Sequence, residues 1–306
     1  MDDSKPPPIN SEPIDTGPSN TPELFPLSKL IDAVAAESER RFTARSAGLP
    51  FGPLTPFPKL TEQLGGCIPD GLHILLGGSG VGKTALALQI AAECKCPCLY
   101  ITCEMTATEL LRRTTARVTR TYLGKFKDGT LTGPTVAKLA GQAAAKCPKL
   151  VIADATQVYA RPDWIKQIAQ TLKSGNDHLL VIVDSLHSWA ESAETGSQDY
   201  ELISVACKEL RTLAANLECP IIAIAERNRA SFAKGASKDK VSAGAGSRKI
   251  EYGSETVINI EKDDDQGPSP TGDQTVTMQF AKNRNGAAGK DIKLIFEGGF
   301  QNYREA

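Results

Sequence analysis

The sequence predicts a doubly wound α/β fold, in which a mainly parallel sheet is covered by helices on both faces. From about residue 60, short runs that are apolar throughout alternate with longer runs of helical periodicity, as in buried parallel strands with helical crossovers. After Ile224 the helical runs stop and strand-like runs follow one another, which predicts extra strands at one edge of the sheet. The 306 residues, of which 41% are hydrophobic, are enough to bury the core of one large domain.

The elements follow in chain order from the spacing of the apolar residues. Buried strands are expected at 73–77, 98–102, 149–154, 178–184 and 220–225. Helices are expected between them at 83–93, 106–120, 162–174 and 199–218. The extra edge strands are expected at 255–261, 275–281 and 290–298, separated by turn signals rich in Gly, Asp and Asn.

The N-terminal part has a different composition, with most of the prolines of the chain in its first 58 residues. Residues 1–26 contain too few apolar residues to order themselves and are expected to form a disordered arm. Residues 27–58 are expected to form a linker helix, over 27–46, followed by a Pro-rich linker, and 59–306 form the main domain. Because the helix has an apolar stripe but no domain around it, we expect it to dock on another subunit.

Charge and hydropathy exclude several classes of protein. With a formal net charge of −1, any contact with nucleic acid has to come from a local basic loop or an assembled channel. No run approaches the roughly 18 apolar residues of a membrane span, and the first residues lack the features of a signal peptide. A soluble, cytoplasmic protein without a membrane partner is therefore expected. The eight cysteines are expected to be reduced, and Cys94, Cys96 and Cys98 lack the spacing of a zinc site.

A glycine-rich segment between the first expected strand and helix fits the pattern G-x-x-x-x-G-K-[ST]. It consists of Gly77, Gly78, Ser79, Gly80, Val81, Gly82, Lys83 and Thr84. In this pattern backbone N–H groups surround phosphates, the lysine reaches the β and γ phosphates, and the threonine ligates Mg²⁺. An ordinary glycine-rich turn is the alternative, but the complete motif in this context predicts a binding site for ATP and Mg²⁺.

Two carboxylates follow other expected strands at the edge where this loop lies. Asp184 ends an apolar strand, as does the aspartate that holds the magnesium shell in P-loop enzymes, although an Asp at this place also caps turns. Glu104 follows the strand 98–102, and the carboxyl ends of strands in such sheets face the ligand crevice. It is therefore a candidate for activating the attacking water, and its alternative role is to stabilise the first turn of the next helix.

Six ordered segments resemble the RecA-like ATPase domain of DnaB-type replicative helicases over about residues 60–290. They are LTEQLGGCIPDGLHILLGGSGVGKTALALQIA, YITCEMTATELLRR, LLVIVDSLHSW, CPIIAIAERNR, GSRKIEYGSETVINIE and FAKNRNGAAGK. The resemblance implies a RecA-like P-loop fold, ATP hydrolysis with Glu104 activating water, and a homo-oligomer, expected to be a hexameric ring. It also implies that Lys282 and Arg284 act as trans-acting fingers in the neighbouring subunit's nucleotide site, whereas the residues alone indicate a hairpin turn with solvated charges.

The chain departs from the family pattern in two places. The family usually has a Gln as γ-phosphate sensor, where this chain has Glu226, and an acid facing a triphosphate needs compensation by Arg227, Arg229 or the metal. DnaB proteins also carry a helical N-terminal domain that meets primase, whereas here only the linker helix and the Pro-rich arm precede the ATPase domain. The sequence is therefore expected to resemble a stand-alone plasmid or phage helicase, with a primase or a loader among its candidate partners.

Two segments are candidates for contacting single-stranded DNA. One is a loop whose basic residues lie among Gly, Ala and Ser, a composition that allows a mobile loop to follow phosphates. These basic residues are Lys234, Lys238, Lys240, Arg248 and Lys249. The other segment, 187–198, contains Glu191 and Glu194 and lacks base-stacking aromatic residues except Trp189, which weakens the case for it. A solvated flexible loop is the alternative for the basic segment.

The sequence leaves three functional hypotheses. The first is an ATP-driven ring helicase that translocates on single-stranded DNA in replication. The second is a RecA/KaiC-like regulatory or recombination ATPase without unwinding activity. The third, a P-loop kinase of a small acceptor, would need a lid and an acceptor pocket and would have no use for Lys282 and Arg284 at a subunit boundary.

Overall fold

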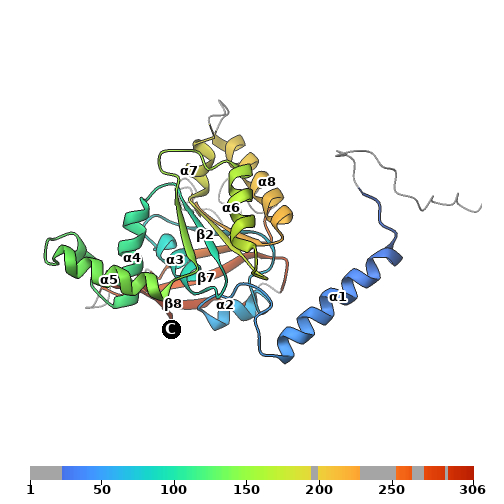
Figure 1. Ribbon diagram of the computed structural model, residues 1–306, viewed down its shortest axis with the longest axis horizontal. Helices are drawn as coiled ribbons and strands as arrows, with labels where there is room; N and C mark the ends of the chain where they lie inside the picture. Colours follow the sequence, from blue (N-terminus) through green and yellow to red (C-terminus); the bar gives the residue numbers. More distant parts are fainter. Residues whose placement is uncertain (1–22, 194–198, 228–252, 264–271, 287–288) are drawn as a thin grey trace, which may run out of the picture. The chain divides into compact units, whose positions relative to one another are not determined.

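The computed structural model describes residues 23–193, 199–227, 253–263, 272–286 and 289–306. The chain divides into two units, residues 1–49 and 50–306. Within the described residues, the second unit contains a nine-stranded sheet in the order β3-β2-β4-β5-β1-β6-β7-β8-β9 (Figure 1). Strands β1 to β6 pair in parallel, and β7, β8 and β9 extend the sheet in antiparallel fashion.

The elements lie close to the positions that the apolar pattern predicts. The strands are β1 Gly71–Gly77, β2 Cys98–Thr102, β3 Leu150–Asp154, β4 Leu180–Asp184, β5 Pro220–Glu226, β6 Thr256–Lys262, β7 Gln274–Asn283, β8 Ile292–Glu297 and β9 Asn302–Glu305. The helices are α1 Leu27–Ser46, α2 Pro58–Gln63, α3 Lys83–Glu93, α4 Ala107–Thr119, α5 Gly133–Lys146, α6 Pro162–Lys173, α7 Leu186–Glu191 and α8 Asp199–Leu217, with 3-10 turns η1 Leu123–Phe126 and η3 Gly298–Phe300.

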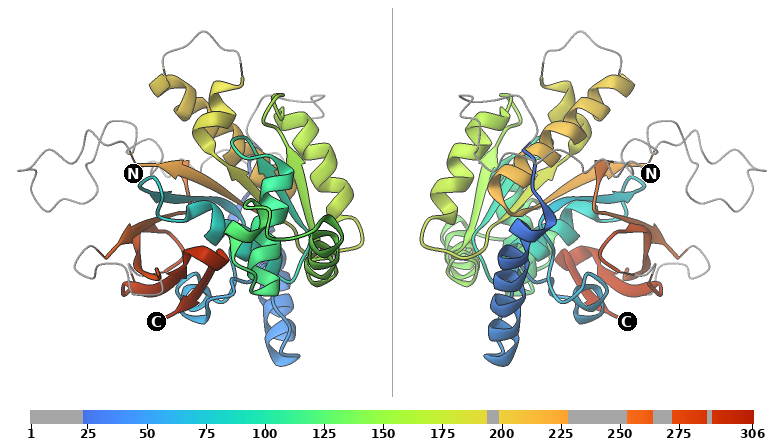
Figure 2. Two further views of the ribbon diagram at one scale, coloured as in Figure 1. Left: turned by 90° about the vertical axis from the view of Figure 1, so that its left-hand side faces the viewer. Right: turned by 90° about the vertical axis from the view of Figure 1, so that its right-hand side faces the viewer.

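The sheet separates two hydrophobic layers, because successive side chains of a strand point to opposite faces. On one face, alternate residues such as Leu75 and Ile224 pack with α2, α3 and α4. On the other face, Ile74 and Ala223 pack with α6, α7 and α8. Figure 2 shows the helices on both sides of the strands, which is the expected doubly wound arrangement.

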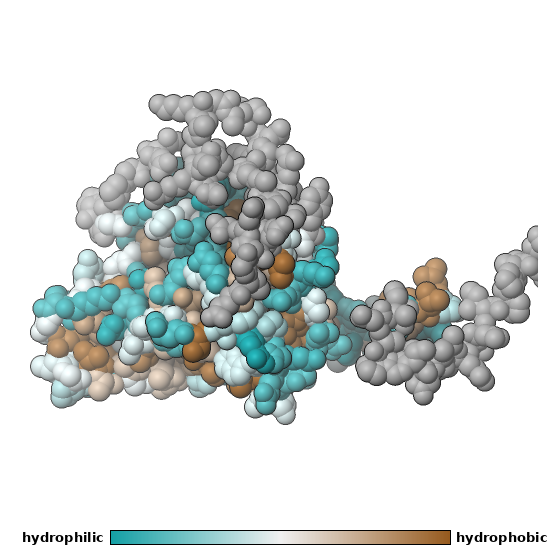
Figure 3. Space-filling view, turned by 90° about the horizontal axis from the view of Figure 1, so that it is seen from above, coloured by the Kyte–Doolittle hydropathy of each residue, from teal (hydrophilic) through white to brown (hydrophobic). Residues whose placement is uncertain are grey.

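Helix α1 occupies the residues predicted for the linker helix and forms part of the first unit. None of its residues is buried, and Leu27, Ile31, Val34 and Phe42 are each more than 60% exposed. Within the described residues, no helix is both long and apolar enough to span a membrane. Figure 3 shows polar and apolar side chains interspersed over the described part of one face.

Helix α5 and strand β9 are the main elements that the sequence pattern does not predict. The α5 helix begins after Thr132, whose side chain accepts a hydrogen bond from the backbone of Thr135, and Ala143 is its one buried residue. A helix that is rich in Ala and exposes most of its surface leaves a weak apolar periodicity. Strand β9 has only four residues, which is too short for a clear alternation.

His73 is a buried residue of β1, and its ring bonds to β6 and to the segment that precedes β1. Its Nδ1 lies 2.8 Å from Thr256 Oγ1 and its Nε2 lies 2.6 Å from the carbonyl oxygen of Pro69. Because a carbonyl only accepts, Nε2 donates to Pro69 and Nδ1 accepts from Thr256. Burial lowers the pKa of His73 to about 4, against opposing contributions from the Pro69 carbonyl and Glu255.

The low pKa of His73 predicts a loss of stability in acid. Between pH 6.5 and pH 4 the unfolded chain binds a proton at this position and the folded chain does not, so stability falls as the pH falls through this window. We expect this group to remove about 2 kcal/mol from the free energy of unfolding between about pH 7 and pH 5. Urea unfolding of the parent and His73→Gln at both pH values tests this, and equal pH dependence in the two proteins would contradict it.

Candidate nucleotide site

The loop between β1 and α3 has the backbone conformation that a glycine-rich phosphate loop needs. Gly80 and Gly82 have φ angles of +73° and +91°, in the region that favours glycine. A Cβ atom on Gly82 would also lie 2.4 Å from the hydroxyl of Tyr303. That hydroxyl donates a 2.6 Å hydrogen bond to the carbonyl oxygen of Val81, so β9 supports the loop.

A second contact attaches helix α3 to β9. The side-chain amide of Gln89 donates to the carbonyl oxygen of Tyr303 at 3.0 Å, and its oxygen accepts from the backbone N–H of Tyr303 at 2.8 Å. Both residues are buried. The C-terminal strand therefore fixes both the loop and the helix that follows it.

Lys83 is the cation of the loop, and its ammonium group lies inside the fold. Its Nζ donates to the carbonyl oxygens of Gly77 and Gly78, at 3.0 and 2.8 Å, and lies 3.5 Å from Oε1 of Glu226. The residue is only 8% exposed. The structure thus places Lys83, from the loop, and Glu226, from β5, at the same end of the sheet.

Asp184 lies beside the loop, at the carboxyl end of the strand β4. Its carboxylate accepts a 2.7 Å hydrogen bond from the hydroxyl of the fully buried Tyr100, and the side chain of Thr84 also bonds to it. Burial raises the pKa of Asp184, while the two hydroxyls and nearby Lys83 oppose that effect.

The side chains of Thr84 and Asp184 fit a magnesium ion. Both supply oxygen ligands, which Mg²⁺ prefers. A carboxylate that burial makes costly to ionise gains most from a cation next to it. Bound there, Mg²⁺ would neutralise charge on the phosphate oxygens, and Thr84 and Asp184 are the residues that would hold it.

Glu104 stands at the same edge, after β2, and two serines orient it. The hydroxyls of Ser185 and Ser188, at the start of α7, both donate to Oε1 of Glu104, the latter at 3.0 Å. The backbone N–H of Cys103 donates to the carbonyl oxygen of Asp184 at 2.6 Å. The turn that carries Glu104 is therefore joined to the end of β4.

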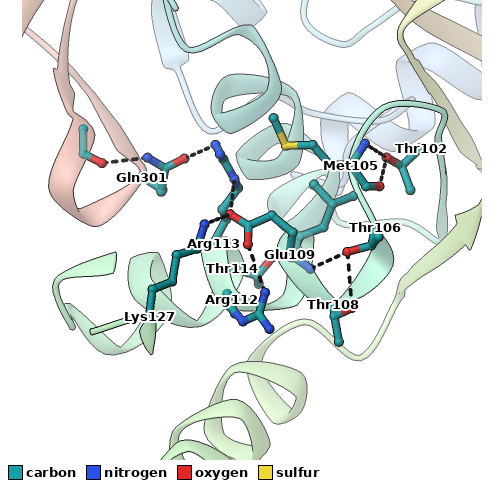
Figure 4. A network of polar contacts seen from close by, with 12 residues as sticks. Thr102, Met105, Thr106, Thr108, Glu109, Arg112, Arg113, Thr114, Lys127 and Gln301 are labelled. Carbon is teal, nitrogen blue, oxygen red and sulfur yellow. Dashed lines mark hydrogen bonds and ion pairs between the residues drawn. The ribbon is translucent and has the colours of Figure 1, made fainter. Parts of the chain in front are cut away.

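Further hydrogen bonds fix this turn from the other side (Figure 4). The hydroxyl of Thr102 donates to the carbonyl oxygen of Met105 at 2.5 Å. Thr106 caps α4 by accepting from the backbone N–H of Glu109, and the N–H of Ala107 donates to the carboxylate of Asp154. Thr106 is therefore the N-cap of α4, and Glu109, not Glu104, is the acidic residue in the first turn of this helix.

Glu109 is the centre of the polar network that Figure 4 shows on α4. Its carboxylate accepts from Arg112, Arg113 and Lys127 at 3.1, 3.3 and 2.9 Å. Partial burial raises its pKa, but the bonds from Lys127 and the two arginines outweigh burial and hold the pKa below the usual value. Arg113 also donates to Gln301 at 2.7 Å, which ties α4 to the turn before β9.

Lys282 and Arg284 lie at the opposite end of the sheet from the loop. Lys282 donates to the carbonyl oxygen of Ser254 at 2.6 Å, and Arg284 contacts the carboxylate of Glu255 at 3.1 Å. The N–H of Glu255 in turn donates to the carbonyl oxygen of Leu72, at the start of β1. The structure thus does not bring these two residues to the loop of their own chain.

The structure describes only part of the two segments that are candidates for contacting DNA. The five basic residues of the segment 230–249 lie outside the residues that the structure describes: Lys234, Lys238, Lys240, Arg248 and Lys249. Trp189 is completely buried, and its indole N–H donates to the carbonyl oxygen of Ala160 at 2.8 Å. It is a core residue, so it cannot stack on a base in this conformation.

Sequence reasoning missed Tyr100, Ser185 and Ser188, which hold the two carboxylates. A tyrosine inside the apolar strand CLYIT is a usable signal, because a buried hydroxyl needs a partner. The serines carry no such signal, since a Ser after an Asp is typical of an ordinary turn or helix cap. Tyr303 was likewise not a candidate, because it lies far along the chain from the loop that it supports.

A matched pair of glycine substitutions tests the geometry of the loop. Gly82→Ala places a methyl group against Tyr303 at a positive φ, so we expect it to lower the free energy of unfolding by about 1–3 kcal/mol. Gly78→Ala is the control, because no atom of the described residues lies within 4 Å of a Cβ at that position. Urea unfolding of both variants checks this, and equal stabilities would contradict it.

Comparisons with known proteins find relatives of this chain. A family model described as the DnaB-like helicase C-terminal domain matches residues 52–305. The replicative DNA helicase DnaB of Buchnera aphidicola (subspecies Baizongia pistaciae) is 25% identical over 301 residues, covering 95% of this chain and 63% of that protein. That of Pasteurella multocida is 25% identical over 300 residues, covering 94% of this chain and 61% of that protein. The chain thus spans less than two thirds of the length of these relatives.

Solved structures share the fold. One that is described as an ATPase domain has a TM-score of 0.76 at 19% identity, covering 90% of this chain and 98% of that chain. A DnaB-like replicative helicase described with its interactions with primase has a TM-score of 0.74 at 18% identity, covering 93% of this chain and 68% of that chain. A KaiC-like protein from Pyrococcus horikoshii is less similar, with a TM-score of 0.55 at 17% identity over 83% of this chain and 97% of that chain. The predicted RecA-like fold is confirmed.

Proposed function

Because the chain belongs to the family of the DnaB-like helicase C-terminal domain, we propose that it is the ATP-hydrolysing motor of a ring helicase that moves along single-stranded DNA in replication. The observation that carries the proposal is the meeting of four side chains at the carboxyl ends of the parallel strands. Lys83 and Thr84 begin α3, Asp184 ends β4 and Glu104 follows β2, and each has the chemistry that ATP hydrolysis requires.

In this proposal each group has one role in hydrolysis. The backbone of residues 77–82 and the ammonium of Lys83 bind the phosphates, and Thr84 and Asp184 hold Mg²⁺. Glu104 accepts the proton of the attacking water, which its position beside Asp184 supports. The hydroxyls of Ser185 and Ser188 fix the Glu104 carboxylate on one oxygen and leave Oε2 for the water.

Lys282 and Arg284 are proposed to act on the nucleotide of a neighbouring subunit. Through Glu255, Arg284 is connected to Leu72, five residues before the end of β1 at Gly77. At about 3.3 Å per residue, this corresponds to roughly 16 Å along the strand. A neighbour in a ring, proposed to be a homo-hexamer, can present the turn directly to the phosphates, where a guanidinium stabilises charge that develops in the transition state.

The remaining partners also belong to the proposal. The basic segment 230–249 is the candidate for following the phosphates of single-stranded DNA. Helix α1 is proposed to dock its exposed apolar residues on a neighbouring subunit. A primase or a loader is a candidate partner, as the relative described with primase suggests. The RecA/KaiC-like alternative is less well supported, because the KaiC-like structure aligns with a lower TM-score, 0.55, than the DnaB-like structure, 0.74.

Unwinding of a forked duplex, measured beside DNA-stimulated ATP hydrolysis, tests the proposed function. We expect the parent protein to displace the strand only with ATP. Hydrolysis without displacement under conditions in which rings form would instead support the second hypothesis of a regulatory or recombination ATPase.

Glu104→Gln and Lys83→Ala separate binding from hydrolysis. Glu104→Gln keeps the shape of the side chain and removes the base, so ATP should bind while hydrolysis falls by about 10²- to 10⁴-fold. Lys83→Ala should abolish tight ATP binding, because it removes the buried ammonium from the loop. Equilibrium ATP binding and steady-state hydrolysis measure both effects, and parent-level hydrolysis by Glu104→Gln would refute its assigned role.

Mixing two inactive variants tests the shared site. Arg284→Ala should bind ATP almost normally and hydrolyse it roughly 10³- to 10⁵-fold more slowly. Mixed rings with Lys83→Ala contain some interfaces with an intact loop on one side and an intact finger on the other, so activity should partly recover. No recovery despite demonstrated co-assembly, or full activity of Arg284→Ala alone, would exclude the trans-acting role.

A further inference from the structure

Glu226 contacts the ammonium group of Lys83, which is proposed to bind the phosphates of the nucleotide. It is the last residue of β5 and pairs in register with Gly77, the last residue of β1. Its Oε1 lies 3.5 Å from the Nζ of Lys83.

The hydrogen-bonding capacity of Lys83 is already used in this conformation. An ammonium group has three donors. The three acceptors around it are the carbonyl oxygens of Gly77 and Gly78 and the carboxylate of Glu226. A phosphate that binds Lys83 must therefore displace one of them.

Glu226 is the acceptor that can move. The two carbonyl groups belong to the backbone of the loop, and Gly77 is fixed by its pairing with β5 and β6. The side chain of Glu226 is 55% exposed, against 9% for that of Lys83. It can turn into solvent at little cost, but its charge then remains close to the incoming phosphate.

Among the described residues, the charged groups near Glu226 do not offset the repulsion between its carboxylate and an incoming phosphate. Arg227, which could have compensated it, contacts the carboxylate of Glu261 at 2.6 Å. His187 lies nearby, but burial lowers its pKa and so favours the neutral ring. Glu104, at the same end of the sheet, adds further negative charge.

We propose that Glu226 is an internal counter-ion of Lys83 that competes with the γ-phosphate and thereby reduces the preference of this site for ATP over ADP. This inference rests on the proposed nucleotide function of the site. In P-loop enzymes the loop backbone and its lysine hold the β and γ phosphates, and the γ phosphate is the group that ATP has and ADP lacks. A γ phosphate bound to Lys83 would therefore approach Glu226, whose Oε1 lies 3.5 Å from the Lys83 ammonium. The carboxylate therefore weakens triphosphate binding more than diphosphate binding.

Glu226→Gln tests the proposal because it keeps the shape of the side chain and removes its charge. Calorimetric titration with Mg²⁺ and either ADP or a non-hydrolysable ATP analogue gives two dissociation constants. We expect the ratio of the ADP constant to the ATP-analogue constant to rise roughly two- to fivefold, as for the loss of one partly exposed charge. Glu226→Ala should shift the ratio in the same direction. Because alanine has no amide that could bond to the phosphate, this second variant isolates the effect of removing the negative charge.

Glu191→Gln is the matched control, because it removes one negative charge from an exposed position of α7 that has no contact with Lys83 among the described residues. It should leave the ratio unchanged. An unchanged ratio in both Glu226 variants, with both nucleotides bound, overturns the inference and leaves the proposed function standing. If the parent protein binds neither nucleotide, the proposed function fails and the inference fails with it.

Discussion

The position of β1 between β5 and β6 is the constraint on which the site depends. Its parallel register places Gly77 beside Glu226 on one side and Ile260 on the other, so the glycine-rich loop leaves the sheet at a fixed point. The pairing of β2 with β4 similarly places Thr102 beside Asp184. Because a shift of one residue would turn every buried side chain to the other face, the two hydrophobic layers hold this register.

The electrostatics of the site follow from this convergence. The same end of the sheet gathers one buried ammonium, on Lys83, and the carboxylates of Asp184, Glu104 and Glu226. A triphosphate adds further negative charge to a region that is already acidic. The backbone N–H groups of the glycine-rich loop and a divalent cation can offset this negative charge.

The sequence predicted the parts of the structure that have a strong local signal. The strand 98–102 and the helix 83–93 have the expected bounds, because a short apolar run and a regular helical stripe are local patterns. The supporting residues depend on contacts between distant segments: Tyr303 lies 222 residues from the Val81 carbonyl that it contacts. For Trp189 the sequence instead suggested a functional role that the structure does not support. An aromatic residue that could stack on a base can equally fill a core, and Trp189 is buried.

The antiparallel strands at the C-terminal edge connect the two ends of the sheet. At one end, Tyr303 of β9 supports the loop and is bonded to α3 through Gln89. At the other end, the turn after β7 carries Arg284, which is held by Glu255 beside the start of β1. Continuous pairing from β1 through β9 joins these points through one sheet, so the support of the loop and the position of Arg284 depend on the same strand pairing.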